Sequence, residues 1–202
     1  MPSLIVHGLI VHGITEWIPY ILNKNFGYGE SASAFTSILI YAIGIASVFI
    51  CNFVYKKFFP KNEMAAGFLF MIASVVPAAI LMILCFNPGA TFGLNAEAVI
   101  FVIMFGLLYF CQLAYSHLLV SLAPSRCSVF ALGATMSGIN NSMTYGGAAI
   151  ATFGLGLIMD YLDIWQLMLI ILICVVVAIV TLIFAVQPWK KFVVKAEDLE
   201  KQ

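Results

Sequence analysis

Five stretches of the sequence contain no aspartate, glutamate, lysine or arginine, and each is longer than a membrane-spanning helix needs to be. They are residues 31–55, 64–96, 98–125, 127–159 and 164–189. About 20 apolar residues are enough for a helix to cross roughly 30 Å of hydrocarbon. Of the 202 residues, 63% are hydrophobic and 9% are charged, whereas soluble domains carry about 25% charged residues. The sequence therefore predicts an integral membrane protein in a lipid bilayer.

A sixth apolar segment opens the chain at residues 3–22 and contains one charged residue, Glu16. All six runs are long and apolar on nearly every face, which favours helices over the short alternating strands of a β-barrel. We expect an all-α membrane protein with six transmembrane helices, at about 3–22, 32–55, 65–86, 97–121, 129–158 and 164–187. These helices form one transmembrane domain over residues 1–187, and a tail follows at 188–202.

Basic residues are concentrated on one side of this predicted bundle. Six spans place both termini on the same side, and eight of the nine basic residues fall there: Lys56, Lys57, Lys61, Arg126, Lys190, Lys191, Lys195 and Lys201. Lys24 is the one basic residue on the other side. The positive-inside rule then predicts cytoplasmic termini and a cytoplasmic tail, in a plasma (inner) membrane. Trp165 and Trp189, near opposite ends of the last helix, are expected to anchor it at the two interfaces.

The polar residues follow a three-plus-three rhythm along the chain. The first, second, fourth and fifth predicted helices carry most of them, whereas the third and sixth carry few. We expect the third and sixth helices to face lipid, as in two three-helix repeats that each place their third member outside.

In the first helix, a stripe at every fourth residue consists of Gly8, His12, Glu16 and Tyr20. Residues at this spacing lie on one side of a helix, and Pro19, which has no N–H, is expected to bend the helix beside them. A carboxylate at the centre of a membrane helix costs roughly 2.5–3.5 kcal/mol on insertion scales, which points to function. The alternative is a hydrated Glu16 near the outer boundary and a neutral His12 bonded to another helix.

The fifth helix combines small and polar residues. Gly138, Ser142 and Gly146 continue a small-xxx-small stripe from Ala134, and such a stripe allows another helix to approach closely. The residues that we expect to line a solute path on this and other helices are His12, Glu16, Tyr41, Gln112, Asn140, Asn141 and Tyr145. Interhelical hydrogen bonding is the alternative role for the asparagines.

The sequence offers little for catalysis or metal binding. The five cysteines are dispersed and odd in number, with no paired spacing: Cys51, Cys85, Cys111, Cys127 and Cys174. Such cysteines predict neither a disulfide framework nor a metal site. No His-Glu-x-x-His pattern occurs, and "GESAS" at 29–33 only half resembles a nucleophile elbow. We therefore expect no cofactor, no metal, no nucleic acid partner and no enzymatic activity, with an intramembrane enzyme as the alternative.

Four segments carry a family resemblance: "HGITEWIPYIL", "VYKKFFPKNE", "SGINNSMTYGGAAIATFGLGLIMDYLDIW" and "PWKKF". The chain resembles the C-terminal six-helix half of a major facilitator superfamily (MFS) permease, nearest to the organophosphate antiporter branch and its sugar-phosphate permeases. The first segment is similar to the Gly-x-x-x-Trp-x-Pro-x-x-Leu signature of the family's seventh helix through Gly13, Trp17, Pro19 and Leu22. The resemblance covers nearly the whole chain.

This resemblance implies half of an MFS fold, with 3+3 inverted repeats, and secondary active transport of a small polar solute by alternating access. The solute would be a sugar phosphate or a related organic anion, although the arginine that phosphate-ester permeases carry on this helix is replaced by Val11. The family passes its substrate between two six-helix halves. The expected partners are therefore a missing N-terminal half or a second copy, and the start of the chain inside its first helix suggests a fragment or a non-transporting assembly subunit as an alternative.

Overall fold

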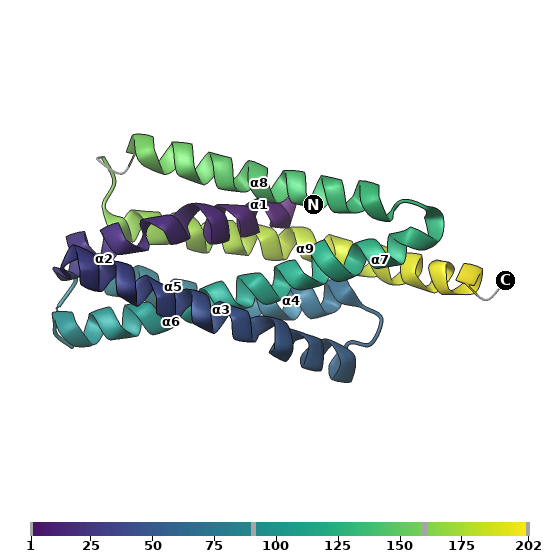
Figure 1. Cartoon of the computed structure of the whole chain (residues 1–202), viewed down its shortest axis with the longest axis horizontal. Coiled ribbons are helices and arrows are strands. Elements are labelled where there is room, and N and C mark those ends of the chain that lie inside the picture. Colours follow the sequence, from purple (N-terminus) through teal and green to yellow (C-terminus); the bar gives the residue numbers. More distant parts are fainter. Residues whose placement is uncertain (1, 90–91, 159–160, 201–202) are drawn as a thin grey trace.

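The computed structural model describes residues 2–89, 92–158 and 161–200. Within these residues the chain is about 90% helix and has no strand. The helices form six rods that lie side by side (Figure 1). The first rod contains α1 (Pro2–Gly8), η1 (Leu9–Gly13), η2 (Ile14–Trp17) and α2 (Ile18–Phe26). The second is α3 (Glu30–Phe58), and the third contains α4 (Glu63–Ala73) and α5 (Val75–Phe86). The fourth contains α6 (Leu94–Ser116), η3 (His117–Leu122), α7 (Ala123–Cys127) and η4 (Ser128–Phe130), and the last two are α8 (Gly133–Ile158) and α9 (Ile164–Glu200).

Five of these rods are long and apolar enough to cross a membrane, and α8 is not among the five. The helix α8 is long enough, with 26 residues, but its asparagines, serines and threonines lower its hydropathy. The prediction of an all-helical protein is confirmed for the described residues, and several of its helices are long and apolar enough to span a membrane. The sixth span stays a prediction.

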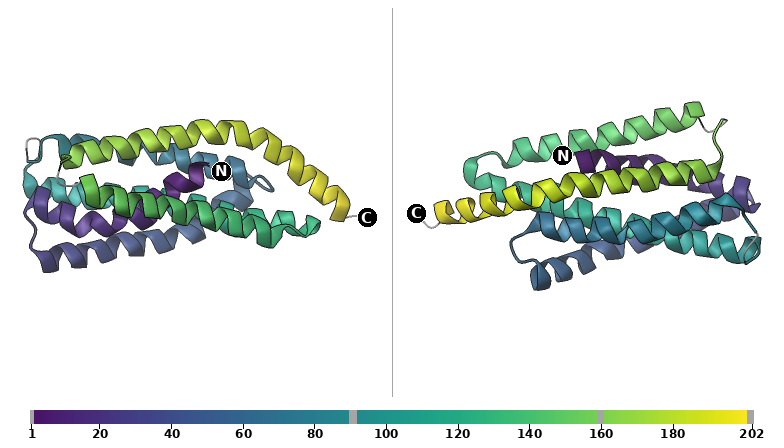
Figure 2. Two further views of the ribbon diagram at one scale, coloured as in Figure 1. Left: turned by 90° about the horizontal axis from the view of Figure 1, so that it is seen from above. Right: turned by 180° about the vertical axis from the view of Figure 1, so that it is seen from behind.

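The rods extend beyond the predicted boundaries at several ends, and two of these extensions are the longest. The segment between the fourth and fifth predicted helices, 122–128, is helical through η3, α7 and η4, and α9 continues through the predicted tail to Glu200. Pro188 lies inside α9 and leaves the carbonyl of Phe184 without a regular helical partner. Figure 2 shows α9 curving along its C-terminal part, as a proline inside a helix explains.

The rods pack in a definite pattern around one apolar core. α3 packs on α6, α4 and α5 pack on α9, and α1 and η1 pack on α8. Of the five rods that are apolar enough to cross a membrane, the first and fourth are the most buried, whereas α3 and α9 are the least buried. The expectation of an outer position therefore fits α9, but the third rod is more buried than α3. Many side chains of α3 are therefore exposed.

The first rod is irregular at the point where Pro19 was expected to bend it. A π-helical turn, η1, is followed by a 3₁₀ turn, η2. Pro19 cannot donate to the carbonyl of Thr15, and that carbonyl accepts from the N–H of Ile18 instead. The Thr15 hydroxyl in turn donates to the carbonyl of Ile10, at 2.8 Å. These bonds satisfy backbone groups that would be costly to leave unpaired in lipid.

Glycines bring the first rod and α8 into backbone contact. A Cβ atom on Gly8 would collide with the backbone of Thr144, and one on Gly147 would collide with the backbone of Ile5. Gly13 lies against the Cβ atom of Ala151. Side chains at these positions would push the two rods apart. The sites of closest approach on α8 are therefore Thr144, Gly147 and Ala151.

We predict that Gly147→Ala destabilises the protein and that Gly146→Ala does not. A methyl group at 147 meets the Ile5 backbone, whereas one at 146 has nothing within 4 Å. Overpacking of this kind costs about 1–3 kcal/mol. Thermal unfolding of the two variants in detergent provides the measurement. Equal transition temperatures for the two variants would contradict the observed contact between α1 and α8.

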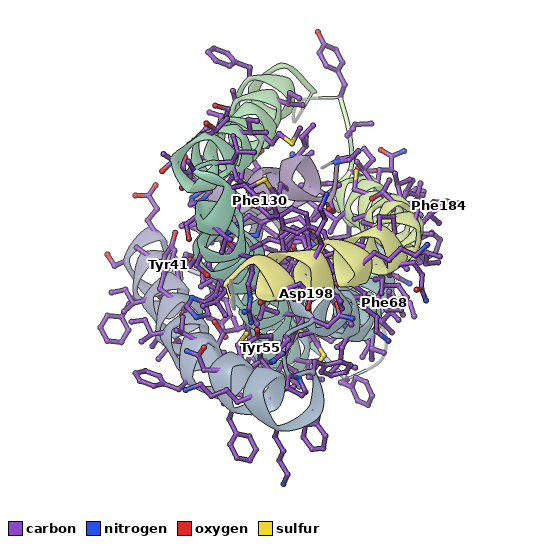
Figure 3. All side chains as sticks on the ribbon, turned by 90° about the vertical axis from the view of Figure 1, so that its right-hand side faces the viewer. Tyr41, Tyr55, Phe68, Phe130, Phe184 and Asp198 are labelled. Carbon is purple, nitrogen blue, oxygen red and sulfur yellow. The ribbon has the colours of Figure 1, made fainter. Side chains whose placement is uncertain are left out.

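A buried carboxylate joins four helices near one end of the bundle. Glu63, at the start of α4, accepts from the hydroxyl of Tyr55 at 2.6 Å and from Nε of Arg126 at 3.0 Å. Its second oxygen accepts from Nε1 of Trp189 at 2.9 Å. Glu63 is 1% exposed, and Figure 3 labels Tyr55 near the C-terminal part of α9. Because α3, α4, α7 and α9 all contribute, this cluster fixes how their ends meet.

Trp189 is the donor that α9 contributes to this cluster, and we predict that Trp189→Phe destabilises the bundle. Hydrogen bonds to charged groups contribute about 1.5–3 kcal/mol, and phenylalanine cannot donate to Glu63. Trp165→Phe is the matched control, since phenylalanine retains an aromatic ring for the edge contact with Phe86. Chemical or thermal unfolding in detergent measures both. A control that loses as much stability as Trp189→Phe would contradict this assignment.

Candidate functional site

Five of the seven residues expected to line a path lie exposed on the surface of this chain, and we call them the polar face: His12, Glu16, Tyr41, Asn141 and Tyr145. They come from η1 and η2 of the first rod, from α3 and from α8. Tyr145 is 64% exposed and Tyr41 is 42% exposed. In Figure 3, Tyr41 lies on the side of α3 that is on the same flank of the bundle as α8.

Residues of the polar face lie at similar depth in the bundle. Glu16 is ten residues before Phe26, the end of its rod, and Tyr41 is eleven residues after Glu30, the start of α3. Tyr145 is thirteen residues before the end of α8 at Ile158. These three helix ends lie at the same end of the bundle (Figure 1). A helix rises about 1.5 Å per residue, so each residue is roughly 15–20 Å from that end, about half the roughly 30 Å that a spanning helix crosses, and we call this level mid-depth.

Aromatic rings on the polar face make specific contacts. The His12 ring stacks on the Tyr145 ring, with centroids 5.6 Å apart and planes at 24°. The Tyr41 ring meets Tyr109 edge-on at 5.5 Å, and Tyr109 packs directly over Gly44. Because Gly44 has no side chain, the Tyr109 ring of α6 can pack on α3 there and contact Tyr41. Both arrangements expose ring surface at mid-depth.

Glu16 is the acidic group of the polar face. Its carboxylate interacts electrostatically with His12 and with Tyr41. Among the residues that the structure describes, Glu16 makes no hydrogen bond and no ion pair. His12, Glu16 and Tyr20 all lie exposed, as their spacing predicts, but Gly8, in the same stripe, turns against α8. The π-helical turn after Gly8 accounts for this change of direction.

The structure does not bring Gln112 and Asn140 to the polar face. Gln112 is fully buried and its amide lies 3.5 Å from the hydroxyl of Ser74. Asn140 is 1% exposed and donates to the carbonyl of Leu119 at 2.7 Å. Successive helical residues point about 100° apart, so Asn140 and Asn141 cannot share a face. Gln112 and Asn140 connect helices inside the bundle.

The predicted packing stripe of Gly138, Ser142 and Gly146 is exposed as well. A Cβ atom on Gly138 or Gly146 would have no atom within 4 Å. No helix of the described residues packs on these two glycines. The stripe that does receive a helix is offset to Gly147, because the contact is set by the backbone of Ile5.

His7 occupies the interior next to the polar face. It is 1% exposed, and its ring lies 6.0 Å from His12 and 6.2 Å from Tyr115. Nδ1 of His7 has no hydrogen-bond partner among the described residues. Tyr115 donates to the hydroxyl of Ser3 at 2.6 Å. Polar groups therefore continue from the polar face into the bundle, where they link the first rod to α6.

The described residues contain no group of three histidine, cysteine or acidic side chains that could hold a metal ion. A cavity of about 150 Å³ lies between the first rod, α8 and α9, and its lining is apolar: Leu9, Ile14, Ile150, Ala151, Gly154, Leu167 and Ile170. Residues of the polar face do not contribute to it. The polar face is an open surface of this chain.

Two buried acids were not singled out from the sequence. Glu63 organises the cluster at one end of the bundle. Glu97, 1% exposed, accepts from the N–H groups of Gly89 and Phe92 in the loop before α6. Both acids lie in the first turn of a helix, where a negative charge is favourable. Each of these two acids directly precedes a long apolar segment in the sequence. This position at the start of a helix was the sequence signal for a structural role.

No known protein-family profile matches the chain, and no curated protein is significantly similar to it.

We predict that Asn140→Ala lowers stability by about 0.5–1.5 kcal/mol, because it leaves the buried Leu119 carbonyl unpaired. Asn141→Ala is the neighbouring control, and its exposed side chain can be removed with little effect on unfolding. Thermal unfolding in detergent compares the two. If Asn141→Ala costs more than Asn140→Ala, the placement of these side chains is reversed.

Proposed function

We propose that the chain forms one half of a secondary carrier for a small polar solute, of the kind that it resembles, the six-helix half of an MFS permease. The observation that supports this proposal is the polar face: three helices present ionisable and hydrogen-bonding side chains at mid-depth, on a surface that is open in this chain. Lipid cannot solvate such groups without a large cost. Water or a partner domain must therefore cover them.

A carrier fits this requirement because its path is wet on one side of the membrane at a time. A second six-helix domain, supplied by another chain or a second copy, would enclose the polar face, and rocking of the two domains would expose it alternately. His12, Glu16, Tyr41, Asn141 and Tyr145 then line the path. Gln112 and Asn140 support it from inside the bundle.

The distribution of basic residues supports one orientation. The end of α3, the start of α4, α7 and the end of α9 lie at one end of the bundle (Figure 1), and these elements or their connections carry Lys56, Lys57, Lys61, Arg126, Lys190, Lys191 and Lys195. By the positive-inside rule, this end faces the cytoplasm, and α9 delivers the C-terminus there. The membrane would be a plasma (inner) membrane.

A non-transporting assembly subunit is the second candidate. The open stripe of Gly138, Ser142 and Gly146 favours it, because small residues accept a helix at close range. In that case the same face would be dry and filled by the helix of a partner. The two candidates therefore differ in whether water reaches mid-depth.

Accessibility of introduced thiols tests the proposal. We expect a membrane-impermeant maleimide to label Glu16→Cys and Asn141→Cys in the full chain reconstituted in vesicles. Phe184→Cys is the control: Phe184 is 75% exposed on α9 (Figure 3) and faces lipid in this arrangement. The unmodified protein gives the background from its five cysteines.

Protection of positions 16 and 141 under all conditions would exclude an aqueous path and with it the carrier. The assembly subunit would then remain, and Gly146→Leu should disrupt its association with a partner. Labelling of position 184 at the same rate as position 16 would show that the reagent reaches all exposed positions, and would also count against the carrier.

A further inference from the structure

We propose that the polar face binds an organic cation, such as a compact substituted ammonium, and not an organic phosphate. The inference deepens the proposed function by naming the substrate class, and it rests on that function for the idea that a solute reaches this surface. The features that carry it are the carboxylate of Glu16, which has no hydrogen-bond or ion-pair partner among the described residues, the exposed tyrosine rings at the same depth, and the lack of basic residues in the stretches of α3 and α8 that contribute to the face.

The sign of the charge on the polar face follows from the sequence and the structure together. Residues 31–55, which supply Tyr41, and 127–159, which supply Asn141 and Tyr145, contain no basic residue. In the first rod, Lys24 is eight residues from Glu16, or roughly 12 Å along the helix, and its ammonium lies over the ring of Tyr20. Glu16 therefore sets the sign of the face. An anionic solute would meet a like charge in a medium where electrostatic interactions are poorly screened.

Tyrosine rings give the same surface a second means of attracting a cation. The exposed ring of Tyr145, held by stacking on His12, and the exposed ring of Tyr41, held by Tyr109, lie at the depth of Glu16. A cation over an aromatic ring is attracted by the negative face of the ring, and the attraction is stronger when the cation is removed from water. The chain already shows such a contact with a tyrosine at the end of the first rod, where the ammonium of Lys24 lies 5.3 Å from the centre of the Tyr20 ring.

These two means of attraction together select for a particular chemistry. The carboxylate of Glu16 balances the positive charge, and the ring faces favour methyl or methylene groups around a nitrogen over a hydrated inorganic ion. A phosphate ester would need guanidinium or ammonium donors, which bind such groups through paired hydrogen bonds. The polar face instead offers carboxylate, amide, imidazole and phenol groups.

Equilibrium binding to the full chain in lipid nanodiscs tests the inference without requiring transport. The probes are radiolabelled choline, its uncharged carbon isostere 3,3-dimethylbutan-1-ol as a competitor, and glycerol 3-phosphate. We expect choline to bind, the isostere to compete at least tenfold less well, and glycerol 3-phosphate not to compete. The choice of choline and its isostere isolates the positive charge, because the two molecules have nearly the same shape.

Variants assign the binding to this surface. Glu16→Gln keeps the shape of the side chain and should weaken choline binding by about tenfold or more. Glu30→Gln, at the exposed start of α3, removes a carboxylate outside the face and should have no effect. Tyr145→Phe should retain binding, whereas Tyr145→Leu should weaken it severalfold, because the ring face and not the hydroxyl makes the contact.

Three results would overturn the inference: no choline binding at millimolar concentration to the folded protein, binding unchanged by Glu16→Gln, or competition by glycerol 3-phosphate in preference to the isostere. None of these results excludes the carrier, which depends on the labelling of positions 16 and 141. Labelling without choline binding leaves a carrier of another solute class. Protection of both positions removes the carrier itself.

Discussion

The backbone contact between the first rod and α8 determines the geometry of the polar face. Gly8 and Gly147 allow the two rods to meet without intervening side chains. His12 then lies close enough to α8 for its ring to stack on Tyr145. If the rods were one side chain further apart, this stacking would be lost. The glycine contact between the two rods therefore positions the polar side chains of the polar face, although glycine itself has no side chain to bind a solute.

The same region also shows how a membrane helix can be irregular at low cost. A π-helical turn and a 3₁₀ turn follow one another in the first rod, and Thr15 donates to a carbonyl of the π-helical turn. In the fourth rod, η3 is also π-helical, and Asn140 donates to the carbonyl of Leu119 within it. Each of these two π-helical turns thus has a side-chain donor for one of its carbonyls, which lowers the cost of irregular backbone away from water. Asn140 therefore has a structural role as the donor to the Leu119 carbonyl, whereas its neighbour Asn141 is exposed on the surface.

The sequence predicted the helices better than it predicted their contacts. Charge-free runs longer than 20 residues indicate helices in any arrangement, so the all-helical fold with several apolar spans followed from them directly. The periodicity of α8 shows that Asn140 and Asn141 must point differently, but not which of them is buried. That choice depends on the carbonyl of Leu119, 21 residues away. The cluster of Glu63 and Trp189 joins positions 126 residues apart, a distance at which local patterns carry no information.

The carboxylates of Glu63 and Glu16 differ in whether other side chains of the protein donate hydrogen bonds to them. Glu63 is buried, and Tyr55, Arg126 and Trp189 all donate to it, so its charge is compensated inside the bundle. Glu16 lies at mid-depth in the first rod and has no hydrogen-bonding or ion-pair partner among the described residues. A carboxylate that the protein itself does not compensate requires water, a proton or a bound cation. Any partner that covers the polar face must therefore leave room for one of these, and a dry interface of apolar side chains is incompatible with an ionised Glu16.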